Sequence, residues 1–333
     1  MRVGIDLGTS NIRIYVPKKG IVVNEPSVVA LSAITQKATS AGDEAKRMLG
    51  RTPEGIVASY PLTDGVIASY KITKQMLEIY LGRVLGRIRI FKPEIIINVP
   101  IGATSTEKKA VLDVVEGIGA KKVYLIKSPL ASAIGAGIDI FSSSGNMIID
   151  VGGGKTEVAV ISLGDIVAFS SVRYGGKKLD TAISDYIRKN KNLIIGEQTA
   201  ELAKIQIGSI VGLKKELKME VSGSNTVTGL PESIMINTAD ITAAIRPPIN
   251  EIILAVKQVL QKTPPELSSD VMDKGIVICG GASLLRNFDE MLTKVTGVPC
   301  QMSEEADLCT IRGIITVMDN FNDYSDSLIW KSK

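Results

Sequence analysis

The sequence predicts an α/β protein made of two similar domains. Segments with strand-like patterns alternate with segments of helical periodicity in both halves of the 333-residue chain, which has room for about two domains. In addition, one hairpin pattern occurs twice. The pattern that contains Asp6 returns around Asp150, and its flanking apolar residues and glycines keep the same spacing of 144 residues.

The second copy of the hairpin indicates which ligands the pattern could bind. The apolar run Met147–Ile149 leads to Asp150 and three glycines, and the alternating segment Thr156–Ser162 follows, which predicts strand, tight turn, strand. A glycine turn lets the backbone approach a ligand closely, and its successive N–H groups bind anions such as phosphate. An Asp at the strand end can hold Mg²⁺, directly or through water. The alternative is a purely structural hairpin. Two copies favour a nucleotide held from both sides, with Asp6 and Asp150 flanking its metal.

Composition excludes several classes of protein. The chain has no His, which rules out His-based catalysis and His-ligated metal. Its 39 basic and 35 acidic residues are balanced and form no dense basic tract, so a nucleic-acid partner is not expected. There is no signal-peptide pattern, and no apolar run approaches the ~18–20 residues of a membrane span. Three cysteines without metal-binding spacing favour a reducing cytosol, and hence a cytoplasmic protein: Cys279, Cys300 and Cys309.

The first half of the chain predicts a strand meander followed by alternating helices and strands. The apolar stripe of Lys71–Gly86 repeats with helical period, and Thr104 with Glu107 forms a capping pattern. The small residues of Pro129–Gly137 suit close packing. In order, we expect strands in Val3–Val16 and Ile21–Leu31, a helix at Ala41–Leu49, a loop over Arg51–Gly65, a helix at Lys71–Gly86, a strand at Glu94–Val99, a helix from Thr104 or Ser105 to Gly117, a strand at Val123–Ile126 and a helix at Pro129–Gly137.

The second half begins after a crossing segment at Phe141–Asn146. Pro247 and Pro248 are expected to kink the long helix in which they lie. The glycines after Cys279 form a strand–Gly–helix junction, which is either a ligand site or only a tight loop. After the hairpin we expect a strand at Ile166–Val172, helices at Leu179–Lys189 and Glu197–Gly208, a small β element at Lys218–Ile236, a long helix at Asp240–Gln261, a strand at Ile276–Cys279 and a helix starting at Gly280–Ser283.

Several longer motifs resemble one known family. They are GIDLGT at Gly4–Thr9, GIVVNEPSV at Gly20–Val28, VPIG at Val99–Gly102, SGNM at Ser144–Met147, DVGGG at Asp150–Gly154, TEVAVISLG at Thr156–Gly164 and KTPPEL at Lys262–Leu267. On these residues the chain resembles the actin-like ATPases and, among them, bacterial MreB. The resemblance covers nearly the whole chain. Sugar kinases and DnaK-type chaperones share only the glycine turns.

The resemblance implies the actin-like fold, a duplicated ribonuclease H-like fold in which two domains enclose ATP or ADP and Mg²⁺. Domain I would comprise residues 1–141 plus 313–333, with a small subdomain at about 32–70. Domain II would comprise residues 142–312, with a small subdomain at about 176–243.

The resemblance also assigns roles to individual residues. Asp6 and Asp150 would attend the metal, and Glu201 and Lys204 would contact the nucleoside, although both suit an ordinary solvated helix as well. The remaining contacts are the two phosphate turns, formed by Gly8, Thr9, Ser10 and Asn11 and by Gly152, Gly153, Gly154, Lys155 and Thr156, and the adenosine-side residues Gly280, Gly281 and Ala282.

Two departures from the family pattern affect hydrolysis. Ser128 stands where the family has the Glu that orients the attacking water, and Lys155 stands where it has a Thr that helps position this water. Losing such a group typically lowers the rate ~10²–10⁴-fold. The ammonium of Lys155 would instead lie where the γ-phosphate is expected and favour phosphate binding. We therefore expect nucleotide binding with weak ATP hydrolysis. The alternative is that Lys155 turns out to solvent. A third departure, Ala306–Leu308 in place of a Pro-Leu pair, concerns the geometry of the last helix.

The resemblance finally implies partners and a cellular role. MreB proteins form membrane-associated filaments that guide cell shape, or helicity and motility in wall-less cells. Ile90 and Phe91, ringed by cations, would insert into the inner face of the membrane, unless they begin the next buried strand. Trp330 is either a second anchor or part of a packed tail. The alternatives are a regulatory subunit that assembles with active MreB paralogues and a small-molecule kinase of the same fold.

Overall fold

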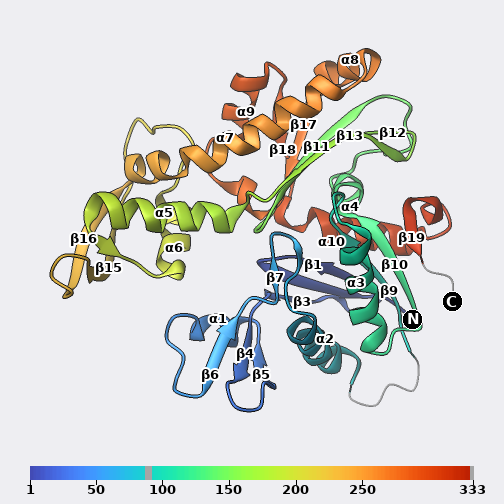
Figure 1. Cartoon of the computed structure of the whole chain (residues 1–333). Helices are drawn as coiled ribbons and strands as arrows, with labels where there is room; N and C mark the ends of the chain where they lie inside the picture. The colour runs from blue at the N-terminus through green and yellow to red at the C-terminus, as the bar shows by residue number, and fades with distance from the viewer. Residues whose placement is uncertain (87–91, 331–333) are drawn as a thin grey trace.

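The computed structural model describes residues 1–86 and 92–330 and contains two large mixed sheets, which lie one above the other in Figure 1. The first sheet has the strand order β19-β10-β9-β1-β2-β3, and the second has the order β13-β12-β11-β17-β18. The first comprises β1 (Arg2–Leu7), β2 (Asn11–Val16), β3 (Gly20–Pro26), β9 (Glu94–Val99), β10 (Lys122–Lys127) and β19 (Leu328–Trp330). The second comprises β11 (Asn146–Val151), β12 (Thr156–Ser162), β13 (Asp165–Val172), β17 (Ile276–Cys279) and β18 (Cys300–Met302).

The two sheets repeat one topology. In each, an antiparallel three-strand meander (β1–β3, β11–β13) continues through two parallel strands (β9 and β10, β17 and β18). Even the turn bonds match: the Gly8 N–H donates to the Asn11 carbonyl at 3.1 Å, and the Gly152 N–H donates to the Lys155 carbonyl at 2.9 Å. The duplicated hairpin and the α/β class predicted from the sequence are confirmed.

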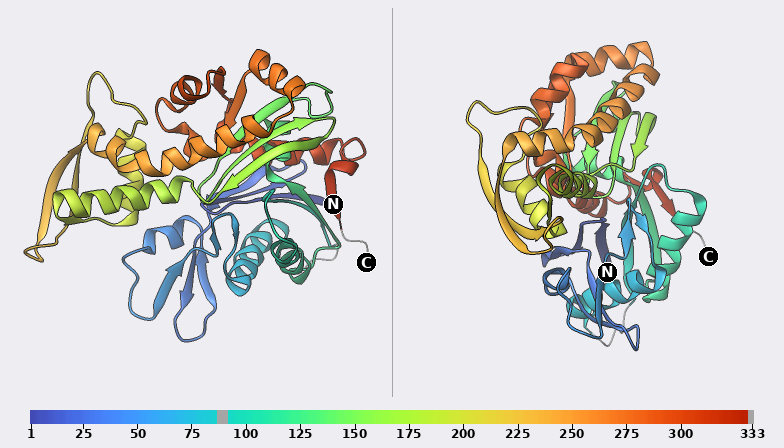
Figure 2. Two further views of the ribbon diagram at one scale, coloured as in Figure 1. Left: turned by 45° about the horizontal axis from the view of Figure 1, so that its top comes forward. Right: turned by 60° about the vertical axis from the view of Figure 1, so that its left-hand side comes forward.

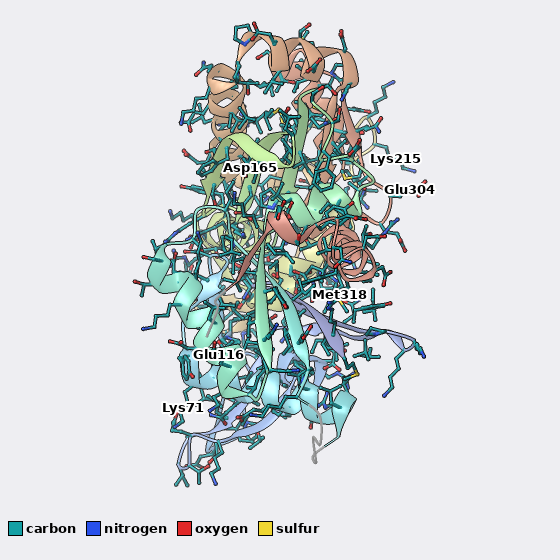
Figure 3. All side chains as sticks on the ribbon, turned by 90° about the vertical axis from the view of Figure 1, so that its right-hand side faces the viewer. Lys71, Glu116, Asp165, Lys215, Glu304 and Met318 are labelled. Carbon is teal, nitrogen blue, oxygen red and sulfur yellow. The ribbon has the colours of Figure 1, made fainter. Side chains whose placement is uncertain are left out.

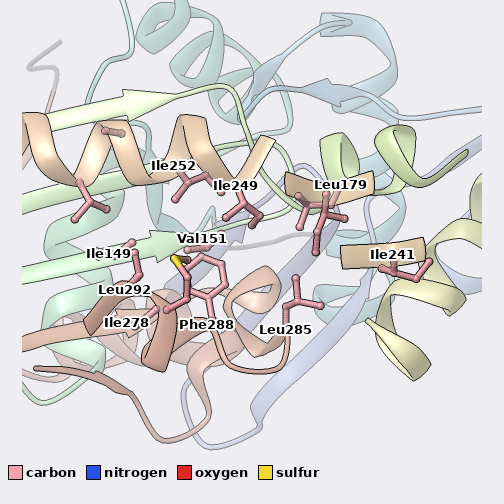
Figure 4. Close-up of a cluster of buried hydrophobic side chains, with 14 of the residues drawn as sticks. Ile149, Val151, Leu179, Ile241, Ile249, Ile252, Ile278, Leu285, Phe288 and Leu292 are labelled. Carbon is pink, nitrogen blue, oxygen red and sulfur yellow. The ribbon is translucent and has the colours of Figure 1, made fainter. Parts of the chain in front are cut away.

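Strand alternation divides the apolar side chains of the second sheet between two cores. Ile149 and Val158 pack against one face with the helices α5 (Gly176–Lys191), α7 (Thr238–Lys262) and α9 (Phe288–Thr296). Figure 4 shows part of this core, with Phe288 and Ile278 facing Ile249 and Ile252 of α7. The side chains in between, such as Ile148 and Ala159, point the other way.

The second core fills the space between the two sheets. It contains α4 (Ser128–Gly135) and α10 (Cys309–Asp319) with side chains from both sheets, including Ile96 and Ile148. Figure 3 shows this arrangement from the side, with Met318 of α10 between Asp165 of β13 above and Glu116 of the helix α3 (Ser105–Gly117) below.

Glycines bring α4 and α10 unusually close. A Cβ at Gly135 would overlap the Cys309 carbonyl, and a Cβ at Gly313 would overlap the Ala131 carbonyl. The close packing expected of this small-residue helix is therefore present.

A third core lies beneath the first sheet. The helices α2 (Tyr70–Leu85) and α3 (Ser105–Gly117) cover it with residues such as Leu77 and Val114. The predicted cap of α3 is confirmed, since the Thr104 N–H donates to Glu107 Oε2 at 2.8 Å and the Glu107 N–H donates to Thr104 Oγ1 at 3.2 Å.

Two small sheets project on the same side of the molecule, at the left of Figure 1 and in the left view of Figure 2. One has the order β5-β4-β6 and the other has the order β14-β15-β16, while β7 and β8 form a separate hairpin. Their bounds, with those of the adjoining helices, are β4 (Val29–Ser32), β5 (Ala38–Ala41), α1 (Asp43–Met48), β6 (Ile56–Ser59), β7 (Leu62–Thr63), β8 (Val66–Ile67), β14 (Leu193–Ile194), α6 (Glu197–Ile207), β15 (Lys218–Asn225) and β16 (Pro231–Asn237).

Two local predictions were wrong. The expected loop over Arg51–Gly65 contains β6 and β7, which are too short to show a period in sequence. The expected helix after Gly280 is only the 3₁₀ turn η1 (Gly281–Leu284), because Ser283 Oγ bonds back to the Gly280 carbonyl and the α-helix starts later. The chain is completed by α8 (Pro265–Lys274), η2 (Ala306–Leu308) and η3 (Ser325–Ser327).

Three sequence predictions are not decided by the fold. The domain limits remain predictions, since one core is shared by both sheets. The expected membrane residues Ile90 and Phe91 lie outside the described part of the chain. For Trp330, the backbone of β19 pairs with β10, which favours the packed tail.

We predict that Gly313→Ala destabilises the protein by about 1–3 kcal/mol or more, because the added methyl group meets a backbone carbonyl that has little freedom to move. The control is Gly82→Ala in α2, where the added Cβ meets nothing within 4 Å. Replacing an open helical glycine should stabilise by about 1 kcal/mol. Chemical denaturation of both variants measures the difference, and equal stabilities would contradict the close crossing.

Candidate functional site

A cavity of about 340 Å³ lies between the two glycine turns, and nearly all predicted site residues line it. They are Asp6, Gly8, Thr9, Ser10, Asn11, Ser128, Asp150, Gly152, Gly153, Gly154, Lys155, Glu201, Lys204, Gly280, Gly281 and Ala282. Thr156 is the exception. It is fully buried, it does not line the cavity, and its hydroxyl donates to the Tyr174 carbonyl at 2.7 Å.

The two turns interlock across the cavity. A Cβ at Gly153 would overlap the Ser10 side chain, and a Cβ at Gly154 would overlap Thr9. Thr9 Oγ1 in turn accepts a hydrogen bond from the Gly65 N–H at 2.8 Å, which ties the β7–β8 hairpin to the first turn. Only glycine permits this approach, so two of the three consecutive glycines are explained by the opposing turn.

The two aspartates occupy equivalent strand ends but have different partners. Asp150 Oδ2 accepts a hydrogen bond from Ser132 Oγ at 2.7 Å, and Ser132 Oγ lies 2.9 Å from Thr310 Oγ1. Asp6 instead pairs with Arg13 at 3.1 Å. Burial raises the pKa of both carboxyls above their ordinary values, and the Arg13 guanidinium opposes this rise at both.

Ser128 is held by its neighbours. Its hydroxyl donates to the Val99 carbonyl at 3.0 Å and accepts from Asn98 Nδ2 at 3.3 Å. Asn98 Oδ1 accepts from the Leu7 N–H at 2.8 Å, so this amide links β1 to the start of α4. The hydroxyl proton is thus committed to a backbone carbonyl.

Lys155 does not turn out to solvent, so that alternative was wrong: its side chain is 16% exposed and forms an ion pair with Glu157. The ammonium is therefore neutralised within the protein rather than left free for a phosphate. Glu157 Oε1 also accepts from the Ile101 N–H at 2.7 Å. Burial raises the pKa of Glu157, and Lys155 opposes that rise.

The expected nucleoside contacts are also ion-paired. Glu201 Oε2 lies 2.7 Å from Lys46 Nζ, and Lys204 Nζ lies 2.7 Å from Asp180 Oδ1. Lys204 Nζ additionally donates to the Gly176 carbonyl at 3.1 Å. Both side chains line the cavity, but neither is a free solvated residue.

Further polar contacts join α6 to α1 and to Tyr60, next to the two small sheets. The Gln198 side-chain amide donates to the carbonyls of Lys46 and Leu49 at 2.8 and 3.1 Å, and Tyr60 Oη donates to Glu197 Oε1 at 2.9 Å. We call these contacts, with the Lys46–Glu201 pair, the cleft latch.

Lys177 adds a titratable group at the cleft latch. Its ammonium lies over the Tyr60 ring. Burial lowers the pKa of Lys177 to about 7, although Glu197 and Glu201 act in the opposite direction.

Sequence reasoning missed several charged residues that line the cavity, among them Arg13, Glu157 and Lys177. A signal for the first two was present, because each is a charged residue within an otherwise apolar or alternating strand, in register with one of the two aspartates. Lys177 gave no such signal, because a lysine that follows a Gly-Gly turn does not by itself indicate burial.

Comparison with known proteins shows the family to which the chain belongs. The profile of the MreB/Mbl protein family matches residues 1–326. The chain belongs to the MreB/Mbl family. It is 43% identical over 320 residues to the cell shape-determining protein Mbl of Bacillus subtilis (strain 168), which covers 96% of each chain. It is also 43% identical over 314 residues to the cell shape-determining protein MreB of Escherichia coli (strain K12), covering 93% of this chain and 90% of the relative.

Solved structures show the same actin-like fold. MreB5 of Spiroplasma citri bound to ADP matches with a TM-score of 0.92 and 34% identity over 98% of each chain. The same protein bound to AMPPNP matches with a TM-score of 0.91 and 33% identity over 98% of each chain. The MamK double helical filament shares the fold alone, with a TM-score of 0.79 and 18% identity over 96% of this chain and 99% of MamK.

The oxygen atoms that line the cavity suit a metal ion that also binds water and phosphate oxygens. Asp150 and Asp6 offer carboxylate oxygens, which Mg²⁺ prefers, together with water and phosphate oxygens. Within the described residues no cluster of three or more acidic or Cys side chains is arranged to hold a metal by itself. The helices of residues 1–86 and 92–330 include none with the length and apolar character needed to cross a membrane.

We predict that Gly153→Ala weakens nucleotide binding by at least about tenfold, because the new methyl group pushes the second turn away from Ser10. Gly212→Ala is the matched control, since an added Cβ there meets nothing within 4 Å. Titration with a fluorescent ADP measures both affinities. Retention of full affinity by Gly153→Ala would contradict a phosphate site between the turns.

Proposed function

We propose that this chain is an ATP-binding bacterial actin homologue that hydrolyses ATP slowly and polymerises into membrane-associated filaments for cell shape, or for helicity or motility in a wall-less cell. The observation that carries the proposal is the pair of interlocked glycine turns around one cavity, with an aspartate behind each. The relatives bound to ADP and AMPPNP, which share the fold over nearly the whole chain, support the choice of nucleotide.

Each group of residues that lines the cavity has a role in the proposed function. The N–H groups of the two turns would bind the phosphates, and Asp150 and Asp6 lie on the side where Mg²⁺ would be held. Bound Mg²⁺ would neutralise phosphate charge. Gly280, Gly281 and Ala282 would cover the adenosine, with Glu201 and Lys204 at its edge.

Slow hydrolysis is supported by the environment of two residues. Ser128 carries a hydroxyl and not a carboxylate, and its oxygen already accepts from Asn98 Nδ2 while its proton goes to the Val99 carbonyl, so it offers no base to an attacking water. Lys155 is bound to Glu157, and this pair also leaves the nearby Glu157 carboxylate neutralised. Neither position 128 nor position 155 therefore presents a free carboxylate to the cavity.

We predict that the double variant Ser128→Glu, Lys155→Thr hydrolyses ATP faster than wild type by about 10²-fold or more, since it restores a base and a water-positioning hydroxyl. Ser128→Gln with Lys155→Thr is the control of similar size that lacks the base. A phosphate-release assay compares the three proteins. Wild-type turnover equal to that of the double variant would contradict the assignment of both residues.

A second role is favoured by the same two residues. A subunit that keeps its ATP because Ser128 and Lys155 do not activate water would stabilise a mixed filament. On this alternative, the chain is a regulatory paralogue that assembles with hydrolytically active MreB proteins.

Electron microscopy of the pure protein distinguishes the two roles. We predict double-stranded or bundled filaments with ATP and fewer with ADP, because the nucleotide site lies between the parts whose relative position a filament would fix. Filaments that form only after an active MreB paralogue is added would support the regulatory role instead.

The proposed location is cytoplasmic, on the inner face of the membrane. Attachment through Ile90 and Phe91 remains a prediction from the sequence. Binding to anionic vesicles, compared between wild type and a variant with Ser at both positions, tests it.

A further inference from the structure

The nucleotide cavity contains a buried arginine that the proposed function does not use. Arg13 is the charged residue of β2 and lies directly opposite Asp6 in the β1–β2 register. It is 7% exposed and lines the cavity. Its Nη1 lies 3.1 Å from Asp6 Oδ2, and its Nη2 lies 3.3 Å from Asp307 Oδ2. Two carboxylates from distant parts of the chain therefore fix one guanidinium at the base of the site.

The guanidinium is not fully satisfied by these partners. Arg13 Nε is buried and has no hydrogen-bond partner among the described residues. A buried donor without a partner is unusual, and a cavity-lining guanidinium offers this donor to an acceptor such as a phosphate oxygen or a water that accompanies it. The side chain thus has the features of a group that belongs to the ligand site rather than to the core alone.

The two equivalent aspartates differ in the charge of the residue that lies opposite each of them. At the position that corresponds to Arg13, the second hairpin has Glu157, which is paired with Lys155 and not with Asp150. Asp150 accepts hydrogen bonds from the hydroxyl groups of Ser132 and Thr310 but has no ion pair with a described residue. Asp6 therefore has a cation in direct contact, whereas the charges of Lys155 and Arg13 act on Asp150 without an ion pair.

A divalent cation distinguishes between these two carboxylates. A guanidinium 3.1 Å from Asp6 already supplies its counter-charge and repels a second cation placed beside it. Asp150 offers a carboxylate that has no ion pair with a described residue, and hard cations such as Mg²⁺ prefer carboxylate oxygen ligands.

We infer that Arg13 is a fixed counter-charge for Asp6, so that the divalent cation of the nucleotide is held on the Asp150 side and Asp6 is not its ligand. The inference rests on the proposed function, because it concerns how that site divides its charges. It departs from the symmetric pair of metal-flanking aspartates that the duplicated hairpin suggests. Arg13 acts here as a positioning residue.

The test measures the affinity for fluorescent ADP with Mg²⁺ and with EDTA. The dissociation constant in EDTA divided by the dissociation constant with Mg²⁺ is called the magnesium gain. Asp150→Asn should lower the gain by at least about tenfold, the order found when a metal site loses an important oxygen partner. Asp6→Asn should leave the gain within about threefold of wild type.

Arg13 itself is tested by two substitutions. Arg13→Gln should raise the gain by about tenfold, because Asp6 becomes available to the cation. Arg13→Lys keeps the charge and should retain the wild-type gain, which a merely structural role would not require. The matched control is Glu305→Gln, which removes the exposed Arg312–Glu305 ion pair nearby and does not line the cavity.

The double variant Asp6→Asn, Arg13→Gln covers the case in which Arg13→Gln does not fold, because it leaves no buried charge unpaired. Its gain should match wild type. An Asp6→Asn variant, or this double variant, that loses as much gain as Asp150→Asn would overturn the inference. An unchanged gain in folded Arg13→Gln would overturn it as well. A wild-type protein that binds no ADP in either buffer would instead contradict the proposed function.

Discussion

The crossing of α4 and α10 determines where the site residues lie. These helices fill the space between the two sheets, and their glycines place the backbone of each against a carbonyl of the other. Ser132 of α4 and Thr310 of α10 meet beside Asp150, and Ser128 begins α4 beside Asn98 of the first sheet. A small change in this crossing would therefore move both the aspartate and the residue expected to face the attacking water.

The duplicated hairpin gives the molecule a symmetric frame with asymmetric chemistry. The backbone turn bonds at Gly8 and Gly152 are equivalent, whereas the side chains that face the two aspartates have opposite charge. A repeated backbone can bind similar parts of a ligand from both sides. On the proposed function, the side chains then determine on which side the metal would be held.

The sequence was sufficient for the parts of this structure that depend on local patterns. Period-two alternation located the hairpins, the Thr104–Glu107 pattern located the start of α3, and the small residues of α4 indicated close packing. The partners of Lys155, Glu201 and Lys204 were not predictable, because these ion pairs join residues whose proximity depends on how the elements pack. Short strands such as β6 were missed for the same reason, since pairing with β4 rather than a local period defines them.

The cleft latch has a consequence for how nucleotide enters and leaves. Its contacts are hydrogen bonds and ion pairs at the rim, whereas the apolar cores lie under each sheet and around α4 and α10. Water can replace such polar contacts at small net expense in free energy. Breaking the cleft latch would therefore expose none of the apolar side chains that form these cores, so opening of the rim and integrity of the fold are energetically separate.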